Sequence, residues 1–272
     1  MRVLPQELEF AKFLLDVGNG ILNNHNDNTI LPCTSILAIN ECIVDHVLGK
    51  LIRENKFEEM SNCAILSARN VDFNDINEQV TDLLEKTYER IYTGIDSTEN
   101  CDNGKLDSGS LLPEYLNSLN PSSLPPYKLR LRKNCIVMLI RNISVNEGLC
   151  NGTRLQIIDF SNHLLKCKVL TGDKLNNVVF LNHIILYCEN EYPFTIKRRQ
   201  FPVMLASAMT INKSQGQTFN KIGIDLRIDV FNHGQLYVSM SRVRSWYSLK
   251  IFLGHEKDRT TVKNFVFKEL LR

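Results

Sequence analysis

The residues between Thr210 and Gly216 are of types that commonly bind phosphate. In the order Thr-Ile-Asn-Lys-Ser-Gln-Gly they bring together hydroxyl and amide donors, the cation of Lys213 and a glycine. A lysine binds phosphate as a compact charge, and a glycine allows backbone N–H groups to approach a ligand closely. The same residues could equally form an ordinary polar turn, so this short run alone leaves both interpretations open.

The segments on either side of this run would place it at the edge of a sheet. An apolar run from Phe201 to Met209 predicts a strand buried on both faces. Residues 221–226 predict a second strand, and residues 230–242 predict a helix that ends at Arg242. Open α/β sheets bind ligands where their parallel strands end. An arginine makes forked contacts with phosphate, although at a helix C-terminus it is also favoured by the helix dipole.

The rest of the chain outside its middle predicts alternating helices and strands. Apolar residues at helical spacing predict helices over residues 6–17, 35–54, 76–91 and 260–271, with Asp75 as the cap of the third. Short apolar runs predict buried strands at 63–68 and 248–253, and polar residues predict a turn at 69–75 and a loop at 97–110. A strand, a turn and a helix in succession are typical of α/β sheets.

The middle of the chain has the pattern of a different domain. Short β-like runs separated by turn residues cover 129–132, 135–141, 153–160, 163–170 and 178–187. Such a series predicts a small barrel or curled sheet inserted into the α/β domain. We therefore expect an α/β domain over residues 1–123 and 196–272, interrupted by a β insertion over 124–195.

Composition and charge are those of an ordinary globular protein. The chain has 272 residues, of which 43% are hydrophobic and 23% charged, and its formal net charge is +2. The charges are unevenly distributed: acidic residues predominate over 72–107 and basic residues over 126–168. The basic stretch favours a polyanionic partner, and a solvated basic face explains it about equally well.

Eight cysteines are present, without a C-x-x-C pair. Most lie among apolar residues, as expected of free thiols in a reducing compartment, and no spacing indicates a zinc or other metal site. The N-terminus lacks the apolar core of a signal peptide, and no run of about 18 apolar residues could span a membrane. These observations predict a soluble intracellular protein without membrane contact.

Two segments resemble motifs of a known family. Residues 210–218 and 233–242 are similar to the fifth and sixth motifs of superfamily-one DNA helicases, and most similar to the petite-integration-frequency type, especially the version carried by Helitron transposons. Further similarity covers residues 1–2, 10–20, 65–77 and 124–155. Asn212 stands where many relatives have histidine, and Asn134-Cys135 replaces a glycine of the family.

The resemblance implies an α/β fold in which a second RecA-like domain is interrupted by a small SH3-like β-barrel. It implies that ATP and Mg²⁺ bind between this domain and a first RecA-like domain. Arg242 and Arg2 would be catalytic, because they would stabilise charge on the transferred phosphate. Gln215 and Gly216 would bind the nucleotide. The residues that would contact single-stranded or forked DNA are Thr210, Asn212, Lys213 and Ser214.

The sequence does not contain G-x-x-x-x-G-K-[ST], the loop that binds nucleotide phosphates. We therefore expect a missing N-terminal RecA-like domain to be a partner of this chain. The predicted function is that of the C-terminal part of an ATP-dependent 5′-to-3′ DNA helicase, in genome maintenance or Helitron transposition. The alternative is a transposon-derived remnant that only binds single-stranded nucleic acid. The family implies residence in the nucleus, with the mitochondrion as the alternative.

Overall fold

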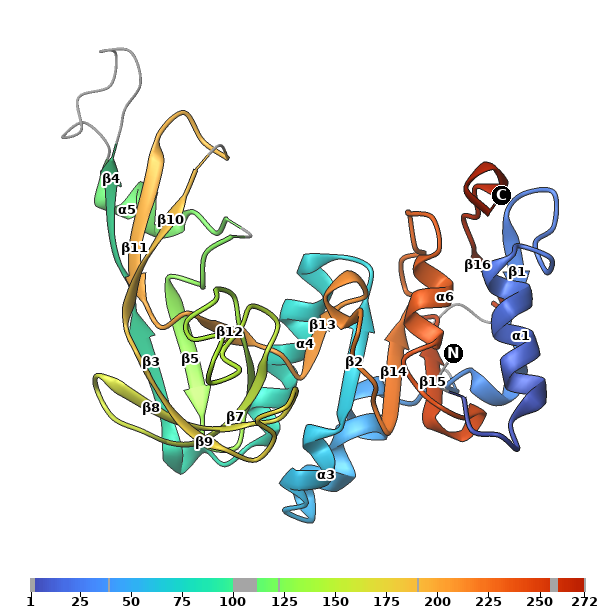
Figure 1. Cartoon of the computed structure of the whole chain (residues 1–272), viewed down its shortest axis with the longest axis horizontal. Helices are drawn as coiled ribbons and strands as arrows, with labels where there is room; N and C mark the ends of the chain where they lie inside the picture. The colour runs from blue at the N-terminus through green and yellow to red at the C-terminus, as the bar shows by residue number, and fades with distance from the viewer. Residues whose placement is uncertain are drawn as a thin grey trace. The chain divides into compact units, whose positions relative to one another are not determined.

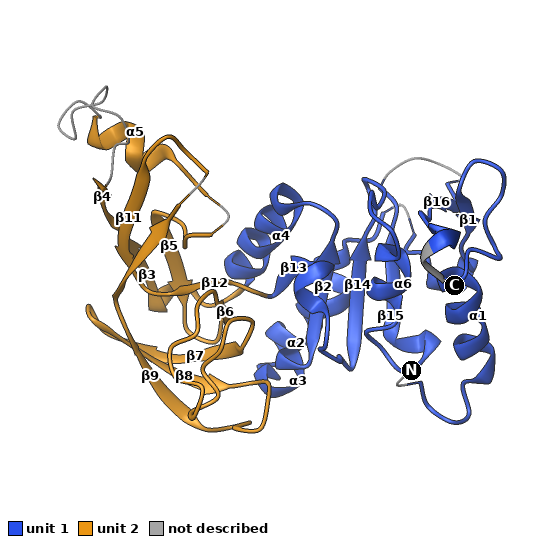
Figure 2. Cartoon of the chain, turned by 45° about the horizontal axis from the view of Figure 1, so that its top comes forward, with its two compact units in different colours: residues 1–83, 207–272 blue, residues 84–206 orange. Residues whose placement is uncertain are grey.

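A computed structural model describes residues 3–38, 40–99, 112–121, 123–189, 191–254 and 259–271, without the side chains of 270 and 271. The chain forms two compact units, shown in two colours in Figure 2. The first unit comprises residues 1–83 and 207–272, and the second comprises residues 84–206. The second unit is thus inserted into the first, and it is wider at both ends than the insertion predicted over 124–195.

The first unit is built on a four-stranded parallel sheet (Figure 1). Its strands, in spatial order, are β13 (Ala208–Thr210), β2 (Cys63–Ser67), β14 (Lys221–Asp225) and β15 (Leu249–Phe252). All residues of β2 are buried, as expected of a central parallel strand that has helices or loops on both faces. The strands predicted at 63–68, 221–226 and 248–253 are confirmed.

The helices of the first unit pack against this sheet or against one another. They are α1 (Leu8–Gly18), a π-helix (Asp45–Gly49) that continues into α2 (Lys50–Arg53), α3 (Phe57–Ser61), α4 (Asn70–Leu83) and α6 (Gln235–Met240). Helix α1 packs against α6. Asn77 of α4 accepts a hydrogen bond from the backbone N–H of Ala208 at 2.8 Å and donates one to its carbonyl at 2.9 Å. The helix therefore satisfies the backbone of the outermost strand, β13, which would otherwise be an open edge. In the described part of the chain no helix has both the length and the apolar character of a membrane span.

Gly223 in the middle of β14 allows a helix to approach the sheet closely. A Cβ atom at this position would lie 2.7 Å from Cγ1 of Ile43 and 2.9 Å from Cγ2 of Val47. Overpacking of a core in this way costs about 1–3 kcal/mol, so we expect Gly223→Ala to lower the free energy of unfolding by about that amount in urea titrations. Ile43→Ala should recover part of the loss in the double mutant, and strictly additive losses would contradict the proposed contact.

The described residues of the second unit form three antiparallel sheets. The largest consists of β12 (Val203–Leu205), β6 (Ile136–Leu139), β7 (Arg154–Phe160), β8 (Leu164–Val169) and β9 (Val178–Asn182), in that order. The second consists of β10 (Ile184–Cys188), β11 (Thr195–Gln200) and β4 (Ile95–Glu99), and the third of β3 (Glu89–Thr93) and β5 (Lys128–Arg132). A short helix, α5 (Pro113–Ser118), packs near β4.

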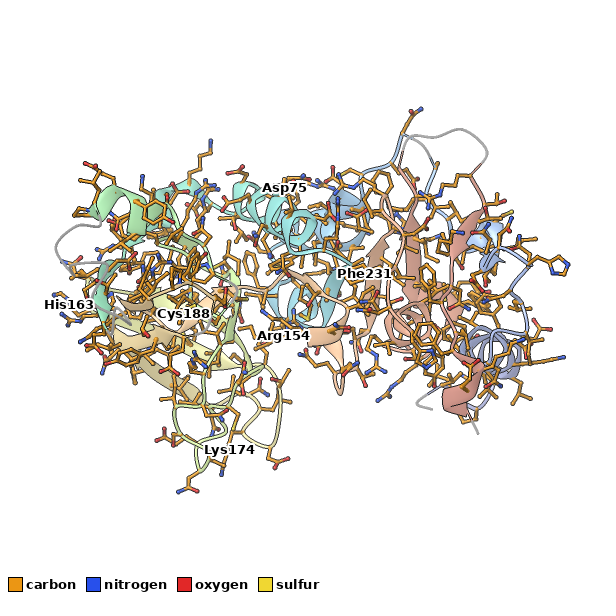
Figure 3. All side chains as sticks on the ribbon, turned by 90° about the horizontal axis from the view of Figure 1, so that it is seen from above. Asp75, Arg154, His163, Lys174, Cys188 and Phe231 are labelled. Atoms are coloured by element: carbon orange, nitrogen blue, oxygen red, sulfur yellow. The ribbon has the colours of Figure 1, made fainter. Side chains whose placement is uncertain are left out.

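Buried side chains hold each of these sheets in place. Leu116, Leu124, Leu186, Phe194 and Ile196 form an apolar cluster beneath the β10–β11–β4 sheet. Arg154 and Cys188, labelled in Figure 3, are each 1% exposed. Arg154 donates to the carbonyl oxygen of Ala206 at 3.2 Å, at the point where the chain leaves this unit.

An ion cluster lies at the start of β3 in the second unit. Oε2 of Glu89 accepts hydrogen bonds from Nε of Arg132 at 2.5 Å and from Nε of Arg130 at 3.0 Å. These bonds hold the pKa of Glu89 below its ordinary value.

A carboxyl group whose pKa is lower in the folded state stabilises the fold above its unfolded pKa of about 4.3. That contribution is lost as the pH falls through the lowered folded pKa. We expect the free energy of unfolding to decrease below about pH 4.5, and Glu89→Gln to make the decrease shallower. Urea unfolding between about pH 3 and pH 7 measures this, and an unchanged pH slope in Glu89→Gln would contradict it.

Several predicted elements are wrong in their bounds. The run 201–209 forms two strands, because the chain passes here from β12 in the second unit to β13 in the first. The backbone N–H of Ala206 donates to the carbonyl of Ile136 in the second unit. The carbonyl of the next residue, Ser207, accepts from the N–H of Ile65 in the first. The run 178–187 is likewise split between β9 and β10 at His183, whose ring lies 3.8 Å from that of Phe201. A run of apolar residues indicates burial, but it does not show whether the residues are buried in one sheet or in two.

Further predicted helices, a predicted turn and a predicted loop also require correction. Helix α4 begins at Asn70, so the predicted turn at 69–75 and the cap at Asp75 are wrong, and it ends at Leu83. The helix predicted over 35–54 is helical only in its second half, and that over 230–242 only from Gln235 to Met240. The predicted loop 97–110 begins inside β4, and its residues beyond 99 lie outside the described chain.

The closing helix predicted over 260–271 is replaced by β16 (Thr261–Lys263) and a 3₁₀ turn (Lys268–Leu271). Strand β16 pairs with β1 (Asn28–Ile30), more than 200 residues earlier in the chain. A pairing over such a distance leaves no local signal, and its hydrogen bonds override helix propensity. The helix predicted over 6–17 is confirmed as α1.

Candidate functional site

Three parallel strands of the first unit end at one level. The register pairs Thr210 of β13 with Ser67 of β2, and the same Ser67 with Asp225 of β14. The loops that follow these strands therefore start side by side at the carboxyl edge of the sheet. This is the edge at which open α/β sheets bind ligands, and we call it the carboxyl edge below.

The loop after β13 brings together most of the residues predicted to bind DNA. The backbone N–H of Ile211 bonds to the carbonyl of Ser67 at 3.0 Å, which fixes the start of the loop to the sheet. Residues 212–214 then form a 3₁₀ turn. Asn212 and Lys213 are exposed and Thr210 is half-buried, so amide, ammonium and hydroxyl groups lie on one short surface.

Ser214 does not take part in this surface. Its side chain is fully buried, and its hydroxyl donates to the carbonyl of Ile211 at 2.6 Å. A serine hydroxyl bonded back to the residue three positions earlier closes a turn. The predicted DNA contact by Ser214 is therefore corrected to a structural role in this loop.

Lys213 is an exposed lysine with a lowered pKa. The residue is exposed, yet surrounding protein atoms reduce the hydration of its ammonium group and lower its pKa. A poorly hydrated ammonium gains more from an anion than a fully hydrated one, because less water must be removed when the ion pair forms. Lys213 is thus suited to bind a phosphate at the surface.

Gln215 and Gly216, predicted to bind the nucleotide, are both exposed at the end of the same loop. Gly216 has a φ of 80°, and no atom lies within 4 Å of the place where a Cβ would be. Its requirement for glycine therefore comes from the left-handed backbone and not from crowding. The open space beside it leaves room for a ligand to approach the backbone.

Arg242 lies next to this loop, as predicted, but its guanidinium group binds protein oxygens. Nε donates to the carbonyl of Val238 at 2.9 Å, Nη1 to the carbonyl of Gln217 at 3.3 Å and Nη2 to the hydroxyl of Ser241 at 2.8 Å. The carbonyl of Arg242 also accepts the N–H of Phe219 at 2.9 Å. The arginine thereby fastens the end of α6 to the loop that follows β13. Arg2, the second predicted catalytic arginine, lies outside the described residues.

Two further arginines at the carboxyl edge were not among the predicted site residues. Asp225, which is 3% exposed, accepts Nη2 of Arg227 at 2.7 Å, and Asp72 accepts Nε of Arg69 at 2.8 Å. The positive charges of Arg69 and Arg227 influence each other. Their positions in the sequence could have identified them, because Arg69 and Arg227 each lie two residues after the end of a buried strand.

The site also contains an unsatisfied buried acceptor. Oε1 of Gln217 is buried and has no hydrogen-bond partner among the described residues, although its Nε2 donates to the carbonyl of Lys213 at 3.2 Å. Leaving such a group unpaired costs about 1–3 kcal/mol. A hydroxyl or amino donor of a ligand, or a water molecule, would remove this cost.

Comparison with known proteins relates these observations to a family. The model of the DNA helicase Pif1 2B domain matches residues 114–160, within the second unit. The ATP-dependent DNA helicase PIF1 of Xenopus laevis is 34% identical over 153 residues, which are 54% of this chain and 22% of that protein. The chain is therefore similar to Pif1 helicases, in the 2B-domain match within its second unit and over about half of its length.

Solved Pif1 structures share the fold of the chain. The Pif1 helicase of Candida albicans aligns with a TM-score of 0.63 at 20% identity, over 98% of this chain and 56% of that one. A Bacteroides Pif1 in complex with ADP-AlF3 and ssDNA aligns with a TM-score of 0.59 at 20% identity, over 98% of this chain and 52% of that one. The predicted resemblance is confirmed, and the chain spans about half of these Pif1 structures and 22% of the Xenopus relative.

Proposed function

We propose that the chain is the part of a Pif1-type ATP-dependent 5′-to-3′ DNA helicase that binds single-stranded or forked DNA and completes the nucleotide site. In this proposal the first unit is the second RecA-like domain, and the second unit contains an SH3-like barrel. One observation carries the proposal. The loop after β13 presents Thr210, Asn212 and Lys213 on the surface, and continues into Gln215 and Gly216 beside Arg242.

On the DNA side, the exposed groups of the carboxyl edge suit a phosphodiester backbone. Asn212 offers an amide donor and Lys213 a cation, while Arg69 and Arg227 are 47% and 40% exposed in their side chains. Contacts to phosphate fix the position of a strand without reading its sequence. This is what a helicase that moves along DNA requires.

On the nucleotide side, the residues of this chain fit one wall of an ATP site. The backbone at Gly216 is open to a ligand, and the unpaired Oε1 of Gln217 is an acceptor for a donor group. ATP would supply the phosphoryl group whose transfer releases energy. Arg242 would stabilise the charge on that group once its guanidinium turns from the protein oxygens toward it.

The carboxyl edge does not fit a Mg²⁺ ion equally well. Its strand-end carboxylate, Asp225, already accepts three hydrogen bonds from Nε and Nη2 of Arg227. A carboxylate engaged by a guanidinium group has little capacity left to hold Mg²⁺, which demands near-ideal octahedral oxygen ligation. We therefore propose that the Mg²⁺ ligands and the phosphate-binding loop come from an N-terminal RecA-like domain of the helicase.

Binding of a fluorescein-labelled oligothymidylate, followed by fluorescence anisotropy, tests the DNA side. If about four phosphates are contacted, the affinity should fall about 50-fold between about 50 mM and 200 mM NaCl. Asn212→Ala/Lys213→Ala should weaken binding and flatten the salt dependence, because it removes a phosphate contact. Lys12→Ala, an exposed lysine on α1, is the matched control. An affinity that does not change with salt, or an equal loss of affinity in Asn212→Ala/Lys213→Ala and in Lys12→Ala, would contradict the proposal.

The alternative is a transposon-derived remnant that only binds single-stranded nucleic acid. Both proposals predict the same binding of single-stranded nucleic acid. They differ in whether Arg242 takes part in ATP hydrolysis. The Helitron relationship, a role in genome maintenance and residence in the nucleus stay predictions.

A further inference from the structure

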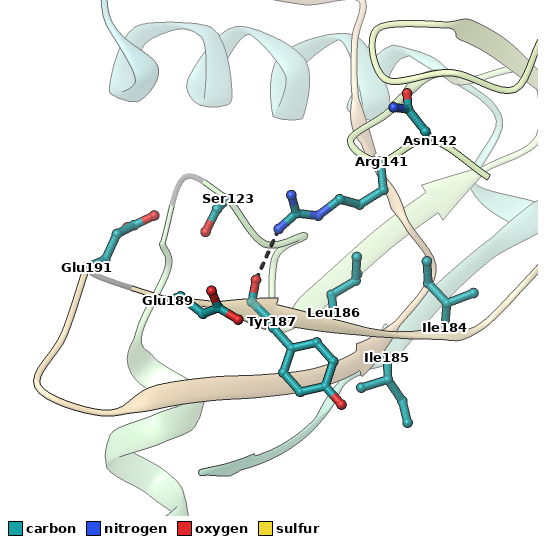
Figure 4. Close-up of a pocket in the computed structure, with 9 residues that line it drawn as sticks. All are labelled: Ser123, Arg141, Asn142, Ile184, Ile185, Leu186, Tyr187, Glu189 and Glu191. Atoms are coloured by element: carbon teal, nitrogen blue, oxygen red, sulfur yellow. Dashed lines mark hydrogen bonds between the residues drawn. The ribbon is translucent and has the colours of Figure 1, made fainter. Parts of the chain in front are cut away.

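Strand β10 has an unpaired edge beside a groove. Within the described residues β10 pairs only with β11, so its other edge is open. A groove of about 570 Å³ runs along this edge, lined mainly by residues of β10 with Ser123, Arg141 and Glu189 among the others (Figure 4). An edge strand that faces an open groove is a template for pairing with another chain.

One hydrogen bond shows which backbone groups face the groove. Nη2 of Arg141 donates to the carbonyl of Tyr187 at 3.0 Å, drawn as the dashed line in Figure 4. In an antiparallel strand the N–H and C=O of one residue point to the same side, and the side alternates along the strand. The backbone groups of Tyr187 and Ile185 therefore point into the groove, whereas those of Leu186 pair with β11.

Exposed apolar side chains accompany this edge. Ile185 is 49% and Tyr187 39% exposed, while Leu186 between them is 3% exposed. An added strand would lie along these side chains and bury part of their apolar surface. The five residues of β10 extend over about 17 Å, which is enough to pair with a short extended segment.

Charge selects the kind of partner. Glu189 and Glu191 are exposed and line the groove. The one cation of the lining, Arg141, already bonds to the Tyr187 carbonyl. Two carboxylates repel the phosphates of a nucleic acid and attract lysine or arginine. With two carboxylates and one guanidinium group, the groove thus differs in charge from the carboxyl edge with its exposed cations.

We propose that the free edge of β10 binds an extended segment of a partner protein, which adds as a strand and places a basic residue against Glu189 and Glu191. Main-chain hydrogen bonds to Ile185 and Tyr187 would supply affinity, and the carboxylates would supply selectivity. Arg141 holds the Tyr187 carbonyl until the added strand replaces it. This inference does not depend on the helicase proposal.

The experiment uses the whole chain and synthetic peptides as probes. The main probe is a fluorescein-labelled hexapeptide of alternating valine and threonine with a lysine added at each end, followed by anisotropy. A second peptide carries glutamate at its ends, and a third is the first peptide N-methylated at every valine and threonine, so that neither of its edges can donate a hydrogen bond to a strand. We expect the lysine-ended peptide to bind at least about tenfold more tightly than either of the others.

Variants of the chain separate backbone pairing from charge. Glu189→Lys/Glu191→Lys should reverse the preference, so that the glutamate-ended peptide binds more tightly than the lysine-ended one. Ile185→Pro should abolish binding, because it removes an N–H that points into the groove and is not needed by β11. Arg141→Ala should bind the lysine-ended peptide a few-fold more tightly, since a competing donor and a like charge are removed.

The outcomes that overturn the proposal are distinct. Equal binding of the N-methylated peptide means that strand addition does not occur. An unchanged peptide preference in Glu189→Lys/Glu191→Lys means that the carboxylates do not select the partner, and this variant is informative even if Ile185→Pro fails to fold. Displacement of the peptide by an oligothymidylate would assign the groove to nucleic acid instead.

Discussion

Replacing Asp96 with alanine is expected to lower the free energy of unfolding of the second unit by about 3–5 kcal/mol. The side chains of Asp96 and Arg198 are 1% and 0% exposed, and they form a two-pronged ion pair between neighbouring strands. Nε of Arg198 donates to Oδ1 of Asp96 at 2.8 Å, and Nη2 donates to Oδ2 at 2.7 Å. Removal of the carboxylate leaves a buried cation without its counter-charge.

The size of the effect follows from how Arg198 is held. Its remaining donors bond to the carbonyl of Pro125 at 2.9 Å and to that of Leu119 at 3.0 Å. These bonds keep the guanidinium group in the interior, so it cannot turn outward to water when Asp96 is removed. An uncompensated buried charge is therefore retained, and this is the costly case for a broken ion pair.

Two variants make the prediction specific. Asp96→Leu/Arg198→Met removes both charges, and we expect it to cost much less than Asp96→Ala alone, because desolvation of the pair offsets most of its attraction. Glu99→Ala breaks an exposed pair on the same strand, in which Lys197 lies 2.7 Å from Glu99, and should cost less than about 1 kcal/mol. Urea unfolding measures all three. A double mutant as unstable as Asp96→Ala would contradict the charge argument.

The carboxyl edge of the sheet could be predicted because buried parallel strands have a strong sequence signal. Each of β2 and β14 is a short apolar run followed by polar residues, and parallel strands must end at a shared edge. The placement of Thr210, Asn212 and Lys213 at that edge followed directly. The pairing of Asp225 with Arg227 was not predicted, because the predicted strand continued to residue 226 and did not mark Asp225 as its end.

The directions of individual side chains could not be predicted in the same way. Ser214 and Lys213 are adjacent polar residues, yet the hydroxyl of Ser214 closes a turn whereas Lys213 is exposed. That choice depends on which carbonyl lies within reach after the turn has formed. For the same reason, the sequence could place Arg242 near the loop but not show that it bonds to Gln217.

The first and last residues of the inserted unit could not be predicted from local sequence patterns either. The largely apolar run over 201–209, broken by Ser207, passes from one unit into the other, because most of its residues are buried in one sheet or the other. The acidic stretch after residue 84 contributes β3 and β4, whose partners β5 and β11 are distant in sequence. Hydrophobic periodicity reports burial, and it does not report in which sheet a residue is buried.

Arg242→Ala is expected to reduce both stability and catalysis, by separable mechanisms. In the chain itself, the carbonyls of Val238 and Gln217 lose their guanidinium donor, which should lower the free energy of unfolding by about 1–3 kcal/mol. Ser241→Ala removes the acceptor of Nη2 and the bond from the Ser241 hydroxyl to the carbonyl of Val238 but keeps the guanidinium group, and is the matched control. Urea unfolding of the three proteins measures this structural role.

The catalytic role that we propose for Arg242 would require the ATP-binding domain of the proposed helicase. We expect negligible ATP hydrolysis by the chain alone, and DNA-stimulated hydrolysis when it is joined to the ATP-binding domain of a Pif1 helicase. In that fusion Arg242→Ala should lower kcat by about 10³-fold or more, as for other arginines that contact a transferred phosphoryl group.

Arg242→Lys separates the two roles of this residue. A lysine keeps the positive charge and can donate to one carbonyl, but it lacks the planar fork. Stability should therefore recover in part while kcat stays low. Full activity of Arg242→Lys, or hydrolysis that falls only as far as the folded fraction does, would mean that Arg242 holds the loop in place and does not contact the phosphoryl group.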